Sequence, residues 1–148
     1  MIRSKRGVGM LDLVFGLLMI GIAGIVFSSS FPPALRTLGQ ASEGTNAALL
    51  SQKKMEQVRG LDYASVTYNN LVSSGVLDPD PAPSGGYYFT DVDGVSSLVP
   101  SGEGIMTITT ESGAIKRIVV SVDWTGVNRK QRNLTVTTLV ADATPWVK

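Results

Sequence analysis

The sequence predicts an α+β protein in which a long N-terminal helix packs on a C-terminal antiparallel β-sheet of three or four strands. Three observations predict this fold class. Fifteen of the twenty residues from Val8 to Phe27 are apolar, apolar residues at helical spacing continue as far as Val58, and runs that alternate between apolar and polar residues follow Gly86. These periods are typical of helices and of half-buried strands. At 148 residues the chain is long enough for one ordinary domain.

Residue types that the chain lacks exclude several kinds of active site. It contains no cysteine and no histidine, which excludes disulfides, thiolate nucleophiles, metal sites built from these residues and histidine-based triads. No pair of carboxylates has a spacing suited to acid–base catalysis, and no glycine-rich loop suits a phosphate. The sequence therefore predicts a protein that is not an enzyme and that has no catalytic residue, cofactor or metal. A net charge of +1 gives no general attraction to nucleic acid.

The N-terminal segment has the features of a membrane segment. Three basic residues lie among the first six, and Asp12 is the single charge of the apolar run that follows. As a helix, residues 13–27 would cover roughly 22 Å. With residues 8–11 the run approaches the roughly 30 Å of a bilayer's hydrocarbon core. The basic residues favour a cytoplasmic N-terminus, which places the rest of the chain outside.

Two interpretations of this segment need no other subunit. The first is a cleaved secretory signal, with Ser28 and Ser30 as the small residues before a cut that leaves Phe31 as the new N-terminus. The second is a plain single-pass anchor. Neither explains why Asp12 lies near the start of the apolar run, because a charge at a helix centre in the membrane costs roughly 2.5–3.5 kcal/mol.

A third interpretation gives this carboxylate a partner. If the chain is cut between Gly7 and Val8, Asp12 becomes the fifth residue of the mature chain and a new α-amino group appears at Val8. A buried carboxylate must be paired or neutralised. The ammonium group of a neighbouring subunit, staggered along a filament, is the natural counter-charge. Asp12 would then form a salt bridge during assembly.

The segment KRGVGMLDL, from Lys5 to Leu13, resembles the class III leader of type IV pilins and pseudopilins. The resemblance implies that prepilin peptidase cuts after Gly7 and methylates the amine of Val8, and that Asp12 is the acidic fifth residue. The sequence departs from the family at two positions: Val8 stands where Phe or Met is usual, and Asp12 stands where Glu is usual. The implied partners are prepilin peptidase, other pilin or pseudopilin subunits and the inner-membrane assembly platform.

The helix is expected to continue beyond the membrane as an amphipathic segment over residues 32–60. One apolar face is expected from Leu35, Leu38, Ala41, Ala48, Leu49, Met55 and Val58. Pro32 and Pro33 predict a kink; two helices joined by a hinge and a locally melted segment that fits a filament core both remain open. Gly60 is a favourable residue just past the helix end. The predicted organisation is a leader at 1–7, a membrane or filament-core helix at 8–31, the amphipathic helix, and a β-rich domain at 61–148.

The C-terminal half predicts the sheet. A turn-rich stretch at 69–86 precedes the predicted strands Tyr87–Val92, Ile105–Glu111, Ile115–Trp124 and Asn133–Ala141, with a hairpin turn at Ser112-Gly113. Alternate apolar residues from Ile118 to Trp124 favour one buried sheet face. The segment from Leu50 to Tyr63 and the terminal hairpin also resemble minor pilins.

Four acidic residues lie in the turns before the second strand. Asp91-Val92-Asp93-Gly94 has the opening of a calcium loop, and some pseudopilins of the family bind calcium, but the downstream acid is missing and a solvated turn is the favoured interpretation. Asp78 and Asp80 alternate with prolines, which predicts a rigid exposed loop. Neither stretch predicts a metal site.

A small basic turn at Arg129, Lys130 and Arg132 is expected to be a plain polar turn, with contact to DNA phosphates as the alternative if the chain serves DNA uptake. The sequence therefore predicts a structural subunit of a type IV pilus-like filament. The unusual leader and the lack of cysteines favour a minor pilin or pseudopilin. It is expected in the inner membrane, spanning once, and after assembly in a surface or periplasmic filament. The alternative is an anchored or secreted envelope β-domain that binds a ligand. Adhesion, motility, secretion and DNA uptake stay open.

Overall fold

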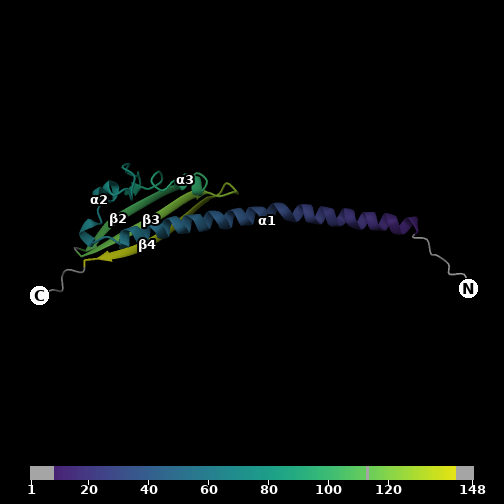
Figure 1. Cartoon of the computed structure of the whole chain (residues 1–148), viewed down its shortest axis with the longest axis horizontal. Helices are drawn as coiled ribbons and strands as arrows, with labels where there is room; N and C mark the ends of the chain where they lie inside the picture. The colour runs from purple at the N-terminus through teal and green to yellow at the C-terminus, as the bar shows by residue number, and fades with distance from the viewer. Residues whose placement is uncertain (1–8, 113, 143–148) are drawn as a thin grey trace, which may run out of the picture. The chain divides into compact units, whose positions relative to one another are not determined.

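The computed structural model describes residues 9–112 and 114–142. The chain divides into an N-terminal unit that ends at Leu38 and a C-terminal unit that begins at Gly39. The helix α1 (Met10–Arg59) contributes residues to both units (Figure 1).

In the N-terminal unit, α1 continues through Pro32 and Pro33 without interruption. A proline lacks the N–H that would bond to the carbonyl four residues earlier. The carbonyls of Ser28 and Ser29 therefore lose this partner. One turn earlier, the hydroxyl groups of Ser29 and Ser30 both donate to the Val26 carbonyl at 2.9 Å. The alternative of two separate helices joined by a hinge is therefore wrong, because one helical segment covers both prolines. A kink at these residues stays a prediction.

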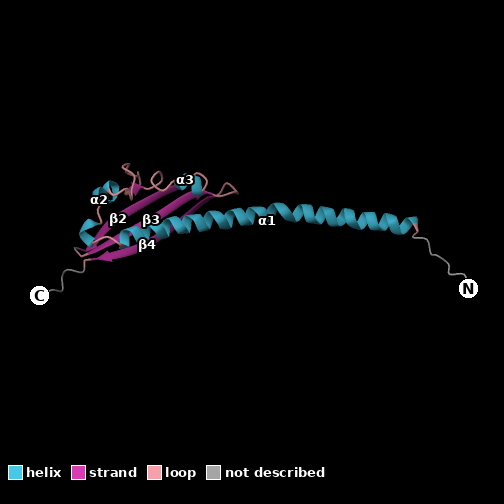
Figure 2. Ribbon diagram, in the orientation of Figure 1, coloured by secondary structure: helices cyan, strands magenta, loops and turns pink. Residues whose placement is uncertain are grey.

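The C-terminal unit combines the end of α1 with a four-stranded antiparallel sheet in the order β1-β2-β3-β4 (Figure 2). The strands are β1 (Tyr87–Tyr88), β2 (Glu103–Ser112), β3 (Ile115–Thr125) and β4 (Gln131–Ala141). The short helices are η1 (Tyr63–Ser65), α2 (Tyr68–Ser73) and α3 (Val95–Leu98). The predicted α+β fold class, with its long N-terminal helix on an antiparallel sheet, is confirmed.

Three of the predicted strands are confirmed nearly to their ends, and the first is much shorter than expected. β1 covers two residues, and Phe89 adds one further bond from its N–H to the Gly104 carbonyl at 2.9 Å. The chain then turns, because the N–H groups of Asp91 and Val92 bind a carboxylate instead of a strand. At the other end of β2, the pairing of Ser112 with Ile115 matches the predicted hairpin.

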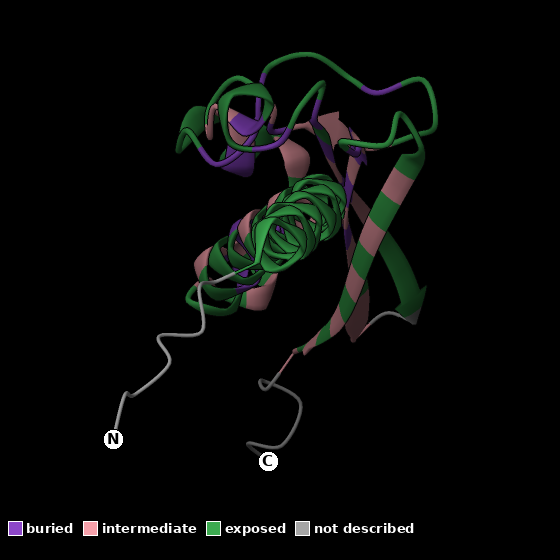
Figure 3. Ribbon diagram, turned by 90° about the vertical axis from the view of Figure 1, so that its right-hand side faces the viewer, coloured by how far each residue is buried: buried purple, intermediate pink, exposed green. Residues whose placement is uncertain are grey.

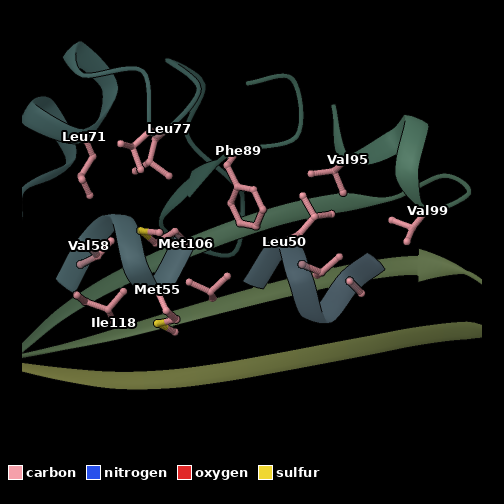
Figure 4. Close-up of a cluster of buried hydrophobic side chains, with 14 of the residues drawn as sticks. Leu50, Met55, Val58, Leu71, Leu77, Phe89, Val95, Val99, Met106 and Ile118 are labelled. Atoms are coloured by element: carbon pink, nitrogen blue, oxygen red, sulfur yellow. The ribbon is translucent and has the colours of Figure 1, made fainter. Parts of the chain in front are cut away.

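The core lies between α1, the inner face of the sheet and the segments around α2 and α3. Figure 4 shows Leu50, Met55 and Val58 of α1 lying close to Phe89 and Met106. On β3 the predicted alternation is confirmed, since Ile118, Val120, Val122 and Trp124 are all buried. On β4 the alternation is between half-buried and exposed residues, which appears as stripes in Figure 3.

The helix face that packs differs from the predicted one. Met55 and Val58 are buried as expected, but the side chains of Leu35, Leu38 and Leu49 are exposed. The buried residues of α1 are Glu43, Ala47, Leu50, Ser51, Lys54, Met55 and Val58. Three of these are polar or charged, so an apolar pattern alone could not identify this face.

A close approach in the core, between Gly104 and Phe89, predicts the effect of a single methyl group. A Cβ at Gly104 would overlap the buried ring of Phe89, whereas a Cβ at Gly44 would meet nothing within 4 Å. We expect Gly104→Ala to lower the free energy of unfolding by about 1–3 kcal/mol through overpacking. The matched control Gly44→Ala should raise it by about 0.5–1 kcal/mol, because alanine favours the helix. Urea denaturation of both variants tests this; equal stabilities would contradict it.

Candidate functional site

The exposed apolar surface of α1 in the N-terminal unit is the first candidate site. Its large apolar residues are more than half exposed, and the exposed set includes Leu11, Leu13, Phe15, Leu18, Ile22, Ile25 and Phe27. This part of α1 is long and apolar enough to cross a membrane, and none of its most apolar window is buried within the chain. Soluble domains rarely leave so large a continuous apolar surface in water.

Asp12 lies in the first turn of α1, and its backbone N–H donates to the Gly9 carbonyl at 2.9 Å. A carboxylate is favourable at a helix N-terminus, where the backbone N–H groups lack partners. Within the described residues, Asp12 forms no ion pair. Gly7 and Val8, the predicted cleavage and methylation positions, lie outside the described residues.

A buried ion pair in the C-terminal unit is the second notable feature. The Lys54 side chain is fully buried, and its Nζ lies 2.9 Å from Oδ2 of Asp93. The same ammonium donates to the Val76 carbonyl and lies 5.2 Å from the centre of the Phe89 ring. Lys53 binds the other oxygen of Asp93 at 2.8 Å from a half-exposed position. Burial lowers the pKa of Lys54 below its ordinary value of 10.5, and the bond to Asp93 opposes that shift.

The turn that carries Asp93 is held by a second acid. Asp78 is 4% exposed, and its carboxylate accepts the N–H groups of Asp91 at 3.0 Å and Val92 at 2.9 Å. The expected solvated turn is therefore correct for Asp91, which is exposed, and wrong for the Asp93 side chain. The expected exposed Pro loop is correct for Asp80 and wrong for Asp78. Both corrected residues are acids that find donors only in the folded chain.

This arrangement does not suit calcium. Both oxygens of Asp93 already face lysine ammonium groups, at 2.8 Å and 2.9 Å. In the described part of the chain, no group of three or more acidic residues could hold a metal ion. A cation there would also be repelled by Lys53 and Lys54.

The sequence did not predict that Glu43, on α1, is a buried carboxylate. Glu43 is 6% exposed and accepts the Trp124 indole N–H at 3.3 Å and the Val127 N–H at 3.2 Å. It thereby joins α1 to the end of β3. The sequence signal was the inward-facing Trp124, whose N–H needs an acceptor when buried, but nothing in the pattern identified Glu43 as that acceptor.

In the basic turn between β3 and β4, Arg129 and Lys130 are exposed and Arg132 binds the chain itself. Arg129 adopts a left-handed conformation with φ of 58°. Arg132 donates to Oε1 of Gln40 at 3.1 Å, so it binds the chain's own helix. This supports the plain polar turn as the interpretation of Arg129, Lys130 and Arg132.

No protein-family model matches this chain, and neither curated proteins nor solved structures show a significant similarity to it. The class of protein that the structure defines is therefore an α+β chain with one N-terminal helix that could span a membrane.

The buried Lys54 predicts a specific pH dependence of stability. Because its pKa is lowered by burial, there is an alkaline range below 10.5 in which the unfolded chain holds a proton at Lys54 and the folded chain does not. In that range the free energy of unfolding should rise with pH, by up to about 1.4 kcal/mol per pH unit. At lower pH the residue is charged in both states, and the cost of burying the charge is fully present.

The test is urea denaturation of the detergent-solubilised chain at about pH 8, 9 and 10, followed by tryptophan fluorescence. We expect Lys54→Met to lose the rise with pH that the wild-type chain shows. The matched control Lys53→Met removes the neighbouring, half-exposed ammonium and should keep the rise. An identical pH profile in the wild type and Lys54→Met would contradict the lowered pKa.

Proposed function

We propose that this chain is a structural subunit of a type IV pilus-like filament, a minor pilin or pseudopilin. One observation carries the proposal: α1 presents a continuous apolar surface with a single acid, Asp12, at its first turn. The leader sequence before it, with Gly7 at the cleavage position, resembles that family. Prepilin peptidase cuts after Gly7 and methylates the new N-terminus at Val8.

The exposed apolar side chains require a cover from outside the chain. Burying one large apolar side chain stabilises by roughly 1.5–3 kcal/mol. Left in water, the exposed apolar surface of α1 would therefore drive aggregation. A bilayer covers it before assembly. In the filament, the same surfaces of neighbouring helices cover one another, and the C-terminal unit supplies the outer surface. When the subunit passes from the bilayer into the filament, the apolar side chains of α1 stay covered, first by lipid and then by neighbouring helices.

Asp12 sets which neighbour fits. Among apolar helices a lone carboxylate is costly, and a positive group nearby recovers much of that cost. The α-ammonium of Val8 on an adjacent subunit supplies the charge once the leader is removed. An uncut chain has no such ammonium at this position, so processing and assembly are coupled through one charge pair.

A second candidate function rests on the same helix. A helix of this length and composition also suits a plain anchor, in which case the C-terminal unit would be a tethered envelope domain that binds a ligand. The two candidates differ in the mature N-terminus and in whether the chain enters filaments. Both place the C-terminal unit outside the inner membrane.

Mass spectrometry of the chain purified from its native membrane separates these candidates. The proposal predicts an N-terminus at Val8 that carries one added methyl group. An N-terminus at Met1 is the result expected of a plain anchor, and an N-terminus at Phe31 is the result expected of a cleaved signal. Either of these two results would overturn the proposal.

Asp12→Ala tests the role of the acid directly. We expect the variant to be processed and to stay in the membrane, and its share in sheared filaments to fall by about tenfold or more, because removing one partner of a buried ion pair leaves the other unpaired. Asp12→Glu should restore incorporation. The matched control Asp80→Ala removes an exposed acid of the C-terminal unit and should have no effect. Normal incorporation of Asp12→Ala would exclude the salt bridge.

A further inference from the structure

The two edges of the sheet differ in whether their outward backbone groups are covered. At the β1 edge, the chain before the strand folds over it: Asp78 donates its N–H to the Tyr88 carbonyl at 2.7 Å, and Tyr88 donates to the Asp80 carbonyl at 3.3 Å. Pro81 forms a bridge with Tyr87. Three prolines, Pro79, Pro81 and Pro83, occupy this covering segment. Proline cannot donate to a further strand, so this edge is closed to strand addition.

The part of β2 that extends beyond β1 is also covered. The Ile108 N–H donates to the Tyr68 hydroxyl at 2.8 Å. The Tyr68 ring stacks on Tyr87 with centroids 4.7 Å apart. A side chain thus takes the place of a neighbouring strand on this side.

The β4 edge has no such cover among the described residues. Gly126 donates its N–H to the Lys130 carbonyl at 2.9 Å, and Asp142 donates to the Ala114 carbonyl at 2.8 Å. In an antiparallel pair, residues alternate between bonding to the partner strand and facing away from it. The two bonds just named join residues that lie opposite each other in the register of β3 and β4, and Lys130 and Asp142 are both even-numbered. The even-numbered residues of β4 therefore bond to β3. The residues whose N–H and C=O groups face outward are Asn133, Thr135, Thr137, Leu139 and Ala141.

The composition of this edge also lacks the usual protection. From Leu134 to Ala141 there is no charge, no proline and no glycine, and five of the eight residues are Val or Thr. Natural edge strands are commonly guarded by lysine, proline or a bulge. Thr135, Thr137 and Leu139 are exposed, and among the described residues no further hydrogen bond reaches their outward N–H and C=O groups.

We propose that the β4 edge binds an extended, uncharged segment of a different polypeptide by strand addition. The row of outward N–H and C=O groups specifies a β-strand as the occupant, since no other conformation pairs with all of them. The uncharged stretch favours a segment without charges opposite Leu134 to Ala141. Such pairing would extend the sheet by one antiparallel or parallel strand.

An antiparallel second copy of this chain does not fit the edge. Head-to-tail pairing would need the β1 edge, which the proline segment closes. Antiparallel pairing of two β4 strands would reverse every element, including the α1 residues from Glu43 to Val58 that pack on the sheet, whereas two chains anchored through α1 in one membrane point the same way. Parallel pairing of two β4 strands would put these α1 residues on opposite faces of the joined sheet, and light scattering detects such a dimer. This exclusion of an antiparallel copy rests on the proposed function, whereas the open edge itself does not.

The orientation of the edge is tested by a pair of proline substitutions. Thr137→Pro removes an N–H that faces outward, so the melting temperature should change by less than about 4 °C. Thr138→Pro removes an N–H that bonds to β3 and should lower it by about 10 °C or more. Circular dichroism of the detergent-solubilised full chain gives both values. Equal losses, or a larger loss for Thr137→Pro, would overturn the assignment of the edge.

The binding test uses a fluorescein-labelled, capped peptide of four alternating Thr-Val pairs and the full chain in detergent. The wild type should bind it saturably by fluorescence anisotropy, and the same peptide with every backbone amide N-methylated should not bind, because neither of its edges can then donate. Thr137→Pro and Thr137→Lys should each weaken binding by about tenfold or more, because they remove a donor or add a guarding charge. The matched control Thr109→Lys places the same charge at an exposed position of β2 and should bind like the wild type.

Four results would overturn the proposal: no binding by the wild type, binding of the N-methylated peptide, binding that Thr137→Pro and Thr137→Lys leave unchanged, or weakening by Thr109→Lys of the same size. Light scattering of the wild type supplies a fifth. A dimer that Thr137→Lys dissociates would assign the edge to a second copy. None of these measurements depends on processing at Gly7, so failure here and failure of the filament proposal are separate outcomes.

Discussion

The buried ion pair between Lys54 and Asp93 fixes how the helix meets the rest of the C-terminal unit. It places an ammonium inside the core, where it also satisfies the Val76 carbonyl, and it draws the turn after β1 onto α1. The Asp78 carboxylate holds this turn by accepting the backbone N–H groups of Asp91 and Val92. Breaking such a pair from one side leaves an uncompensated charge, which is more costly than the pair is favourable. The segment that covers the β1 edge begins at Asp78 and is held there by backbone bonds to Tyr88.

The N-terminal unit depends on the opposite condition. Its apolar residues from Met10 onward, the described part, make no buried core of their own, so their free energy is lowest when lipid or other helices surround them. In the C-terminal unit, buried charged groups find their partners within the chain. The apolar side chains of the N-terminal helix instead need lipid or other helices around them. The proposed filament subunit, held in a membrane before assembly, needs both properties in one molecule.

The sheet edges add a third level of organisation. One edge is closed by prolines and by the Tyr68 hydroxyl, and the other presents an ordered row of backbone donors and acceptors. A sheet with two open edges would polymerise without control, and one with two closed edges could not be extended. One open edge allows a single added strand, which suits a subunit that has a defined neighbour.

The sequence by itself determined the fold class, the strands from Ile115 to Trp124 and from Asn133 to Ala141, and the apolar segment with Asp12, because periodicity and hydropathy are local properties of the chain. Tertiary structure alone decided that Glu43, Lys54 and Asp78 are buried. Each of these charged groups is stable inside only because a donor or counter-charge arrives from a segment at least thirteen residues away in sequence. Such pairings have no period, so the same side chains were indistinguishable from solvated surface residues until the chain was folded.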